Sequence, residues 1–407
     1  AAAPPPPGRR EADKTSWTVA GISTLAYLIV VGYISRRIWD REKLTLRFAE
    51  DDIFMDFITP VMDNSFLTRG TMREYEVDDM AYAADAMRNG KIDEAKLIYK
   101  RITARNPNHA DAIHGLAIAY ALTGEVKFAR ALAQRACSLA ATSQRQIALG
   151  NICYQEGQMS KASTAYALAI RRDPVSAIGH FNSATAAFHM GDYTNARLGY
   201  LAALDREPHY FKCMFNLAIV MEAQGSVAEA KEWMKRAVDV RPTDTRAQYA
   251  LALLYVKLGQ WVKAETQFKA ILNIDGKHAK SKVKLGNLAF RRGQHQRAAA
   301  LYLLAIENDP MDVEALTNLA MLDWCKGAST SCNEQLRLAL TIKPDYYPAL
   351  YNLAVTRLSQ GRVEDSVRYY RRALECANNS PFVKTQMFNL GMALAELDEL
   401  ADNEVPP

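Results

Sequence analysis

The residues able to carry chemistry are thinly spread through this chain of 407 residues. Its six cysteines show no CxxC spacing, and its seven histidines show no HExxH pattern or other ligand pair. Protein zinc sites are built from closely spaced Cys and His ligands, so the sequence predicts no metal. The motifs GxxxxGK(S/T), GxGxxG and GxSxG, which hold phosphate, dinucleotides or an acyl nucleophile, are also missing. We therefore predict a protein that is not an enzyme and binds no cofactor.

One basic cluster could act through its charge. Lys280, Lys282 and Lys284 follow one another closely, and arginines occur at positions 291, 292 and 297. Residues four apart share a helix face, so Lys280 and Lys284 are expected to act together. Such a patch would bind an acidic segment of a partner protein or an anionic lipid head group. The alternative is an ordinary solvated face. The formal net charge is only +5, which gives no general nucleic-acid footprint.

Glycine spacing shows which elements must position these residues. Nine glycines recur at intervals of 34 residues, with one interval of 33: Gly90, Gly124, Gly157, Gly191, Gly225, Gly259, Gly293, Gly327 and Gly361. A fixed period of this length indicates one supersecondary unit copied along the chain.

The copy at residues 211–244 shows what the unit is. Apolar residues such as Phe211 and Phe215 recur at three- and four-residue steps, which predicts an amphipathic helix. Gly225 ends that helix, because glycine adopts the left-handed conformation of a helix C-cap without steric cost. A second helix follows, and Pro242 breaks the chain before the next copy. Each unit is therefore predicted to be a helical hairpin.

Two further columns recur in register. Small side chains, which allow close helix approach, form one column: Ala95, Ala129, Ala162, Ala196, Ala230, Ala264 and Ala298. Bulky groups form the other: Tyr99, Tyr166, Tyr200, Phe268, Tyr302 and Tyr370, with Met234 and Leu336 as substitutes. Cys332 replaces the alanine in the eighth copy.

Leu-Ala or Leu-Gly pairs complete the pattern, at positions 116, 149, 217, 251, 285, 319 and 353. Together these columns resemble the tetratricopeptide repeat (TPR). The resemblance implies an all-α, right-handed α-solenoid of about nine hairpins over residues 76–380. A cap helix and an acidic tail are expected at 381–407. Such a fold binds other proteins and rarely catalyses a reaction.

Some members of the TPR family hold a peptide's C-terminal carboxylate with basic and asparagine side chains on three successive first helices. Asn151, Asn182 and Lys212 match three of the five places, whereas Ile147 and Asn216 stand where lysine and arginine are expected. The resemblance therefore implies a partial carboxylate clamp. Packing between repeats is the alternative role for Asn182.

Residues 15–35 contain no charged side chain. As a helix they would be roughly 32 Å long, enough to cross a bilayer core of about 30 Å. Lys14 and Arg36 flank this segment, and Trp17 and Tyr33 lie near its ends, as interfacial aromatic residues do. We predict a single transmembrane helix. A signal peptide is the alternative.

The flanking segments complete the domain plan. Residues 1–14 are interpreted as a processed proline-rich leader, although a trimmed chain would look the same. Residues 36–75 join the anchor to the repeats and include an apolar stretch with Phe54, Phe57 and Ile58. This stretch is predicted to dock against a neighbouring membrane subunit or to fold back on the first repeat as a cap.

We interpret the whole chain as a non-catalytic, membrane-anchored TPR scaffold. It would be an accessory subunit of a large organellar inner-membrane complex of the respiratory-complex or ATP-synthase type. Its partners would be other subunits and membrane lipids, including anionic lipid at the seventh repeat. The Lys and Arg excess after the anchor favours the matrix side of the mitochondrial inner membrane. The alternatives are a receptor or assembly factor that binds client proteins transiently, and a thylakoid-membrane scaffold.

Overall fold

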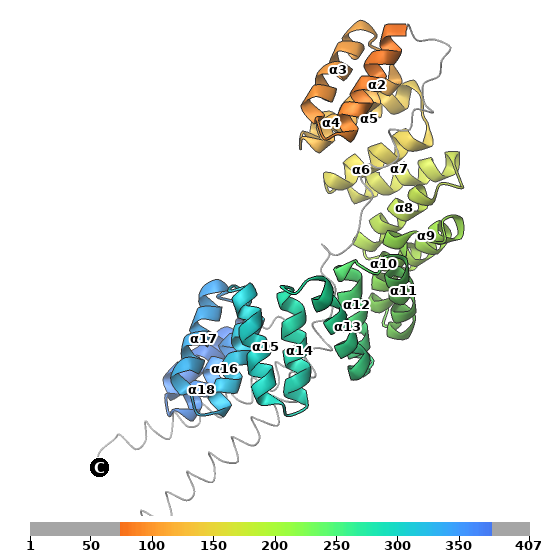
Figure 1. Ribbon diagram of the computed structural model, residues 1–407. Coiled ribbons are helices and arrows are strands. Elements are labelled where there is room, and N and C mark those ends of the chain that lie inside the picture. Colours follow the sequence, from red (N-terminus) through yellow and green to blue (C-terminus); the bar gives the residue numbers. More distant parts are fainter. Residues whose placement is uncertain (1–73, 377–407) are drawn as a thin grey trace, which may run out of the picture. The chain divides into compact units, whose positions relative to one another are not determined.

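The computed structural model describes residues 74–376, which form eighteen α-helices (Figure 1). The all-α prediction is confirmed for these residues. They fall into two compact units, an N-terminal unit at 74–254 and a C-terminal unit at 255–376, and the boundary in the sequence falls within α12 (Thr245–Lys257). No helix among the described residues is long and apolar enough to cross a membrane. The predicted anchor at 15–35 and the predicted tail at 381–407 lie outside them.

The helices form nine consecutive hairpins in the described part of the chain. We number the hairpins as repeats 1 to 9, so that each repeat has an even-numbered first helix and an odd-numbered second helix. Besides α12, the N-terminal unit contains α2 (Glu74–Arg88), α3 (Ile92–Arg105), α4 (Ala110–Leu122), α5 (Val126–Leu139), α6 (Ser143–Gln155), α7 (Met159–Arg172), α8 (Ala177–His189), α9 (Tyr193–Arg206), α10 (Phe211–Ala223) and α11 (Val227–Val240).

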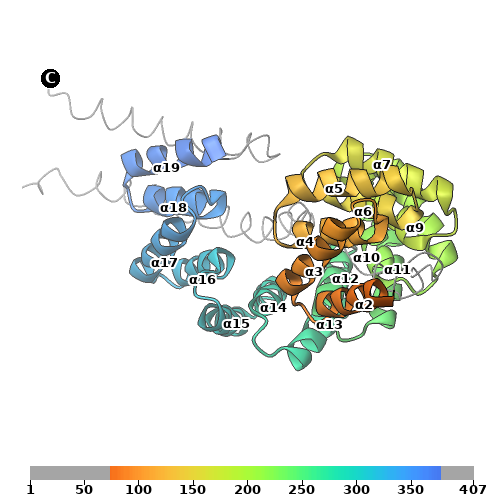
Figure 2. The same cartoon turned by 90° about the horizontal axis from the view of Figure 1, so that it is seen from above.

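The C-terminal unit continues the same pattern. Its helices are α13 (Trp261–Ile274), α14 (Ala279–Arg291), α15 (His295–Asn308), α16 (Val313–Cys325), α17 (Ser329–Ile342), α18 (Tyr347–Ser359) and α19 (Val363–Cys376). Figure 2 shows the hairpins from α14 to α19 following one another in chain order. The first helices α4, α6, α8, α10, α14, α16 and α18 each pack against the second helix of their own repeat and against the second helix of the repeat before it.

The turn inside each hairpin explains the glycine lattice. All nine lattice glycines have φ between 70° and 84°, a conformation that other residues rarely adopt. At the end of α10, the amide of Gly225 donates to Glu222 O (2.9 Å) and the amide of Ser226 donates to Met221 O (2.9 Å). This pair of bonds is the Schellman motif, which satisfies the last carbonyls of a helix. The predicted role of Gly225 is confirmed.

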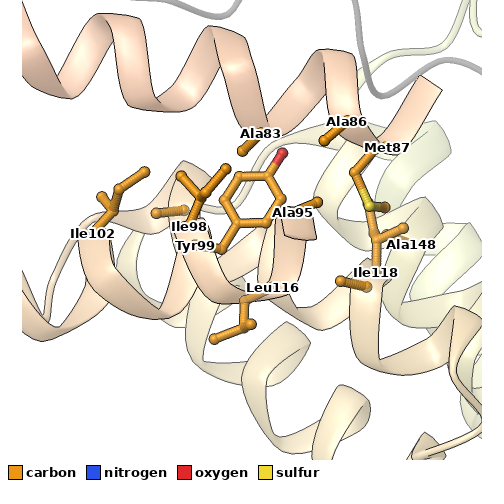
Figure 3. Packing of buried hydrophobic residues seen from close by; sticks show 12 residues of the cluster. Ala83, Ala86, Met87, Ala95, Ile98, Tyr99, Ile102, Leu116, Ile118 and Ala148 are labelled. Carbon is orange, nitrogen blue, oxygen red and sulfur yellow. The ribbon is translucent and has the colours of Figure 1, made fainter. Parts of the chain in front are cut away.

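The alanine and aromatic columns form the core between helices. All seven alanines of the column are fully buried, and the bulky residues of the second column are at most 2% exposed. Figure 3 shows the Tyr99 ring of α3 among Ala83 of α2, Ala95 of α3 and Leu116 of α4. One aromatic side chain therefore joins a hairpin to the next one, and this burial stabilises the stack because a lone hairpin has one bare apolar face.

Repeat 8 keeps this packing with different residues. Cys332 replaces the alanine and Leu336 replaces the tyrosine, and both are fully buried. They pack with Leu316 and Ala320 of α16 and with Leu353 of α18. A free cysteine behaves as a small apolar side chain in such a place. The substitution therefore changes the chemistry of the column without changing its burial.

Candidate protein-interaction surface

A buried hydrogen-bond network links repeats 3 and 4. The hydroxyl of Tyr166 on α7 donates to Asn151 Oδ1 on α6 (2.8 Å), and Asn182 Nδ2 on α8 donates to the same oxygen (2.9 Å). All three side chains are less than 10% exposed. One amide oxygen therefore joins three helices of two consecutive repeats. Buried polar groups cost stability unless they are bonded in this way.

The same arrangement recurs in the C-terminal unit. Tyr302 Oη on α15 donates to Asn287 Oδ1 on α14 (2.7 Å), and Asn318 Nδ2 on α16 donates to the same oxygen (2.9 Å). These distances match those of the first network within 0.1 Å. We call this three-residue arrangement the Tyr–Asn ladder.

Repeats 4 and 5 use a variant of the ladder. Thr185 takes the asparagine position and its hydroxyl lies 2.9 Å from Tyr200 Oη, while Asn216 Nδ2 donates to the same phenol oxygen (3.2 Å). All three are fully buried, and burial raises the pKa of Tyr200 far above its usual range. The phenol therefore stays protonated and keeps its donor at any physiological pH.

The ladder determines what the clamp-like residues do. Asn182 is fully buried and Asn151 is 6% exposed, and Nδ2 of Asn182 donates to Oδ1 of Asn151. Lys212 is half-buried on α10. Ile147 and Asn216, the two places that depart from the clamp pattern, are both buried. The two asparagines of the clamp-like pattern are therefore part of the packing between repeats, which was the alternative role considered for Asn182.

Sequence reasoning missed the ladder, although its signal was present. One column of the 34-residue lattice holds Asn182, Asn216, Asn318 and Asn352, and another holds Asn151, Thr185 and Asn287. A polar residue that recurs on the lattice beside the core columns indicates a bond made between copies.

The predicted lysine cluster of repeat 7 is divided by the fold. Lys280 is exposed and Lys282 is half-buried. Lys284 is only 9% exposed, and its Nζ donates to Glu314 Oε1 on α16 (2.8 Å). Asn287 Nδ2 also donates to this carboxylate oxygen (3.3 Å). The expectation that Lys280 and Lys284 present their charge together is wrong for the solvent-facing surface, because Lys284 is buried in an ion pair between repeats 7 and 8.

The arginines of repeat 7 also have acidic partners. Glu265 on α13 forms ion pairs with Lys269 (2.8 Å), Arg292 and Arg297 (3.4 Å). The hydrogen bond from Lys269, followed by those from Arg292, lowers the pKa of the Glu265 carboxyl to about 2. The Glu265 side chain is 13% exposed, so these bonds are shielded from water more than an ordinary surface pair. Glu265 therefore offsets much of the basic excess at this place.

Arg291 has a third kind of partner. Its guanidinium lies 3.4 Å from the centre of the Trp261 ring at the start of α13. An arginine over an indole face is attracted by the ring quadrupole, by about 0.5–1 kcal/mol at an exposed site. The contact joins the first turn of α13 to the last turn of α14, so Arg291 also connects consecutive repeats.

A second polar cluster, which the sequence did not indicate, lies between repeats 2 and 3. Arg145 on α6 is 6% exposed and forms an ion pair with Asp111 on α4 (2.5 Å). His114 on α4 is 7% exposed, and neither of its ring nitrogens has a hydrogen-bond partner. Burial, with a smaller effect of Arg145, lowers the pKa of His114 to about 4. This imidazole is therefore neutral at physiological pH.

The remaining sequence predictions concern metals and the docking stretch. Within residues 74–376, no group of three or more His, Cys, Asp or Glu side chains could hold a metal ion. The cysteines in this range are free, and burial raises the pKa of Cys137 to about 11 and that of Cys332 to about 12. Such thiols are poor nucleophiles. Phe54, Phe57 and Ile58 lie outside the described residues.

Family models now test the repeat assignment directly. Three models of the tetratricopeptide repeat match the chain, the first at residues 86–145 and 187–254. The second matches 147–210, 249–313 and 283–322, and the third matches 349–382. The chain belongs to the tetratricopeptide repeat family. The resemblance stated from the sequence is confirmed, and the matches cover hairpins in both units.

Solved TPR structures show the same fold. A TPR protein from Parabacteroides merdae has a TM-score of 0.53 and 18% identity, over 62% of this chain and 98% of its own. The C-terminal part of a TPR protein from Cytophaga hutchinsonii has a TM-score of 0.50 and 15% identity, over 58% of this chain and 98% of its own. A comparison with curated proteins finds no match. At these identities the likeness shows the fold alone.

Membership of the TPR family fixes the broad function. TPR proteins bind other proteins through stacked helical hairpins, and they are generally scaffolds without catalytic activity. In this TPR chain the lattice residues are used for packing within the stack.

Proposed function

We propose that this chain is a membrane-anchored TPR scaffold that joins subunits of a large organellar inner-membrane complex. The observation that supports a scaffold is the recurring Tyr–Asn ladder, which joins consecutive repeats at Asn151 and Asn287. Buried hydrogen bonds between repeats restrict the motion of the helices that they join. A rigid array loses little conformational entropy when partners bind, which suits stable assembly.

The membrane anchor is the second part of the proposal. It rests on the uncharged segment at 15–35 with its flanking Lys14 and Arg36. The excess of basic residues after this segment favours the matrix side of the mitochondrial inner membrane for the repeats. A single span would hold the array at the surface where the other subunits of the complex are embedded.

Two partner contacts are proposed on this basis. Phe54, Phe57 and Ile58 form an apolar stretch next to the anchor that a neighbouring membrane subunit would cover. Lys280 and Lys282 remain at least partly accessible on α14 for an acidic segment or an anionic lipid head group. With Lys284 bonded to Glu314, the charge left for this contact is smaller than the sequence indicates.

The decisive experiment is affinity purification of the full chain in mild detergent, followed by quantification of the co-purifying proteins. A scaffold should be recovered in constant stoichiometry with a complex, and it should stay bound in moderate salt. Sub-stoichiometric recovery that is lost in moderate salt would instead identify a transient receptor or assembly factor. Recovery with thylakoid rather than mitochondrial subunits would correct the compartment.

The anchor is tested by extraction with alkaline carbonate. The full chain should remain in the membrane pellet, whereas a chain lacking residues 1–40 should be released. Extraction of the full chain would refute the transmembrane helix at 15–35. The docking stretch is tested by changing Phe54, Phe57 and Ile58 to serine, which should detach a protein whose helical circular dichroism is unchanged.

A further inference from the structure

A groove of about 410 Å³ opens on the surface of the N-terminal unit at repeats 3 and 4. Its lining residues come from α7, α8 and α9, the yellow to light green helices of Figure 1, and from the turn between α8 and α9. Ser183 and Ala187 of α8 and Gly199 and Ala202 of α9 line it with small side chains. Met190 and Leu198 line it too, and they are 44% and 59% exposed.

The sequence explains why the groove is at repeat 4. Seven other repeats have a leucine at the lattice position of Ser183, and the leucines of the adjacent repeats are Leu149 and Leu217. Leu217 is fully buried. Gly199 on α9 faces Ala184 of α8 so closely that a Cβ added there would lie 2.8 Å from the alanine Cβ. Repeat 4 thus lacks the leucine side chain at the place where the groove opens, and Gly199 lets α9 pack closely against α8 beside it.

Asp192 is the polar group of the lining that can only accept hydrogen bonds. Asp192 caps α9, with its carboxylate accepting from Asn195 N (3.0 Å) and Asn195 Nδ2 (2.6 Å). These bonds lower the pKa of Asp192, so it is ionised at neutral pH. His180 Nε2 lies 3.1 Å from Pro174 O. A carbonyl oxygen can only accept, so His180 Nε2 is the donor in this bond.

Charge then indicates the occupant. The lining contains the hydroxyls of Ser163 and Ser183, the Asp192 carboxylate and no lysine or arginine. The guanidinium of Arg206 on α9 is directed to the backbone oxygens of Pro174 and Ala202. A guanidinium carries five N–H donors and a permanent positive charge, and its aliphatic stem packs on apolar surface. The groove offers an acceptor for the guanidinium at Asp192 and apolar surface for the stem at Ala187, Gly199 and Leu198.

We propose that this groove binds an arginine side chain from a partner protein. Its guanidinium lies at Asp192 and its stem lies along Ala187 and Gly199. This inference rests on the proposed scaffold function, because it assumes that a protein segment is the ligand. It adds a specific contact at repeats 3 and 4, far along the sequence from the docking stretch and from the basic residues of repeat 7.

The test uses the full chain with labelled methionine and leucine methyl groups, observed by NMR in detergent. Met190 and Leu198 are reporters in the groove, and buried Met234 on α11 is a reference. The probes are N-acetyl-arginine amide and N-acetyl-citrulline amide, which have the same shape but differ in charge. The arginine probe should shift the two groove methyls with about tenfold tighter binding, as expected for one charge-assisted pair.

Three variants make the test specific. Asp192→Asn keeps a good helix cap but removes the charge, so the preference for arginine should disappear. Ser183→Leu restores the residue of the other repeats and fills the groove, so neither probe should bind. Asp239→Asn removes a charge from an exposed position outside the lining and should change nothing.

Equal binding of both probes to the unchanged chain, or shifts away from Met190 and Leu198, would overturn the proposal. So would an arginine preference that survives in Asp192→Asn. Melting curves by circular dichroism confirm that each variant is folded. Stoichiometric co-purification is measured separately on the unchanged chain, so a scaffold without an arginine site can be told apart from a chain that is not a scaffold.

Discussion

Repeats 3 and 4 differ from repeats 7 and 8, although both pairs carry the same Tyr–Asn ladder. Repeats 7 and 8 add a buried ion pair between Lys284 and Glu314. The positions of repeats 3 and 4 that correspond to Lys284 and Glu314 hold Ala148 and Ile178, and the groove beside Ser183 opens at a different lattice position. The first pair of repeats thus has room for a ligand, and the second uses its polar groups internally.

The same 34-residue repeat pattern gives different surfaces at repeats 3 and 4 and at repeats 7 and 8. Lys284 occupies the column in which Asn182 and Asn318 donate to the preceding repeat, but Lys284 donates to Glu314 of the following repeat. Ser183 occupies the leucine column, so a single substitution removes a core side chain from the outer edge of the packing. The individual features of these two regions therefore come from the positions, such as Lys284 and Ser183, that depart from the repeat pattern.

The largest expected effect tests the part that both regions share. A side chain at Gly150 would overlap the Tyr166 ring, and one at Gly286 would overlap the Tyr302 ring. Gly150→Leu and Gly286→Leu should each cost about 1–3 kcal/mol or more, because the tyrosine must leave its bonded position. Thermal unfolding by circular dichroism measures the loss. Gly179→Ala on α8, where an added Cβ meets only ordinary contacts, is the control and should be neutral or stabilising.

A second experiment separates the charged bond from the neutral one. Lys284→Met leaves the Glu314 carboxylate without its cation and should cost about 1–3 kcal/mol, as for a hydrogen bond to a charged group. Asn182→Ala should cost less, about 0.5–1.5 kcal/mol, because Asn151 keeps its bond from Tyr166. Denaturant unfolding of both variants gives the comparison. If Asn182→Ala proves the more harmful, the ion pair contributes less than the ladder.

The two units should also respond to acid in different pH ranges. His114 has its pKa lowered from 6.5 to about 4, so the unfolded chain binds a proton there that the folded N-terminal unit does not. The free energy of unfolding of this unit should therefore be highest above pH 6.5, and it should decrease as the pH falls from 6.5 toward 4. Glu265 has its pKa lowered from 4.5 to about 2, so its contribution is lost between pH 4.5 and 2.

Hydrogen exchange at a series of pH values can follow each unit separately. Protection around α4 should decrease first, and protection around α13 and α15 should decrease at lower pH. His114→Phe should reduce the loss of protection around α4. Glu265→Gln should reduce the loss of protection around α13 and α15. A single transition that neither variant changes would mean that other groups control the acid response.

The smallest expected effect concerns the phenol hydroxyls. Tyr166→Phe and Tyr302→Phe each remove one donor to an asparagine oxygen that keeps a second donor. Each should lower stability by about 0.5–1.5 kcal/mol, and the two losses should agree because the geometries agree. Chemical denaturation measures the change in the free energy of unfolding of each variant, provided that its dependence on denaturant concentration is the same as in the unchanged chain. Clearly unequal losses would show that the ladder is not the same structural unit in the two regions.

Much of the fold was predictable because the repeat encodes it locally. The spacing of Gly225 and its equivalents predicts hairpin turns, since few residues other than glycine adopt φ near 80°. The burial of Ala230 and of the aromatic column also follows from periodicity alone. The candidate site was less predictable. Asn151, Asn182 and Lys212 match a clamp in sequence, yet the direction of each side chain depends on the neighbouring repeat.

The sequence by itself determined the hairpin, its length and its copy number, because turns and amphipathic faces depend on residues close in the chain. Only the tertiary structure decided which polar groups face one another across repeats. Lys284 and Glu314 are thirty residues apart, and their pairing depends on how α14 packs beside α16. The groove at Ser183 was decided in the same way, since a missing side chain becomes a hollow only when its neighbours on α7 and α9 do not fill it.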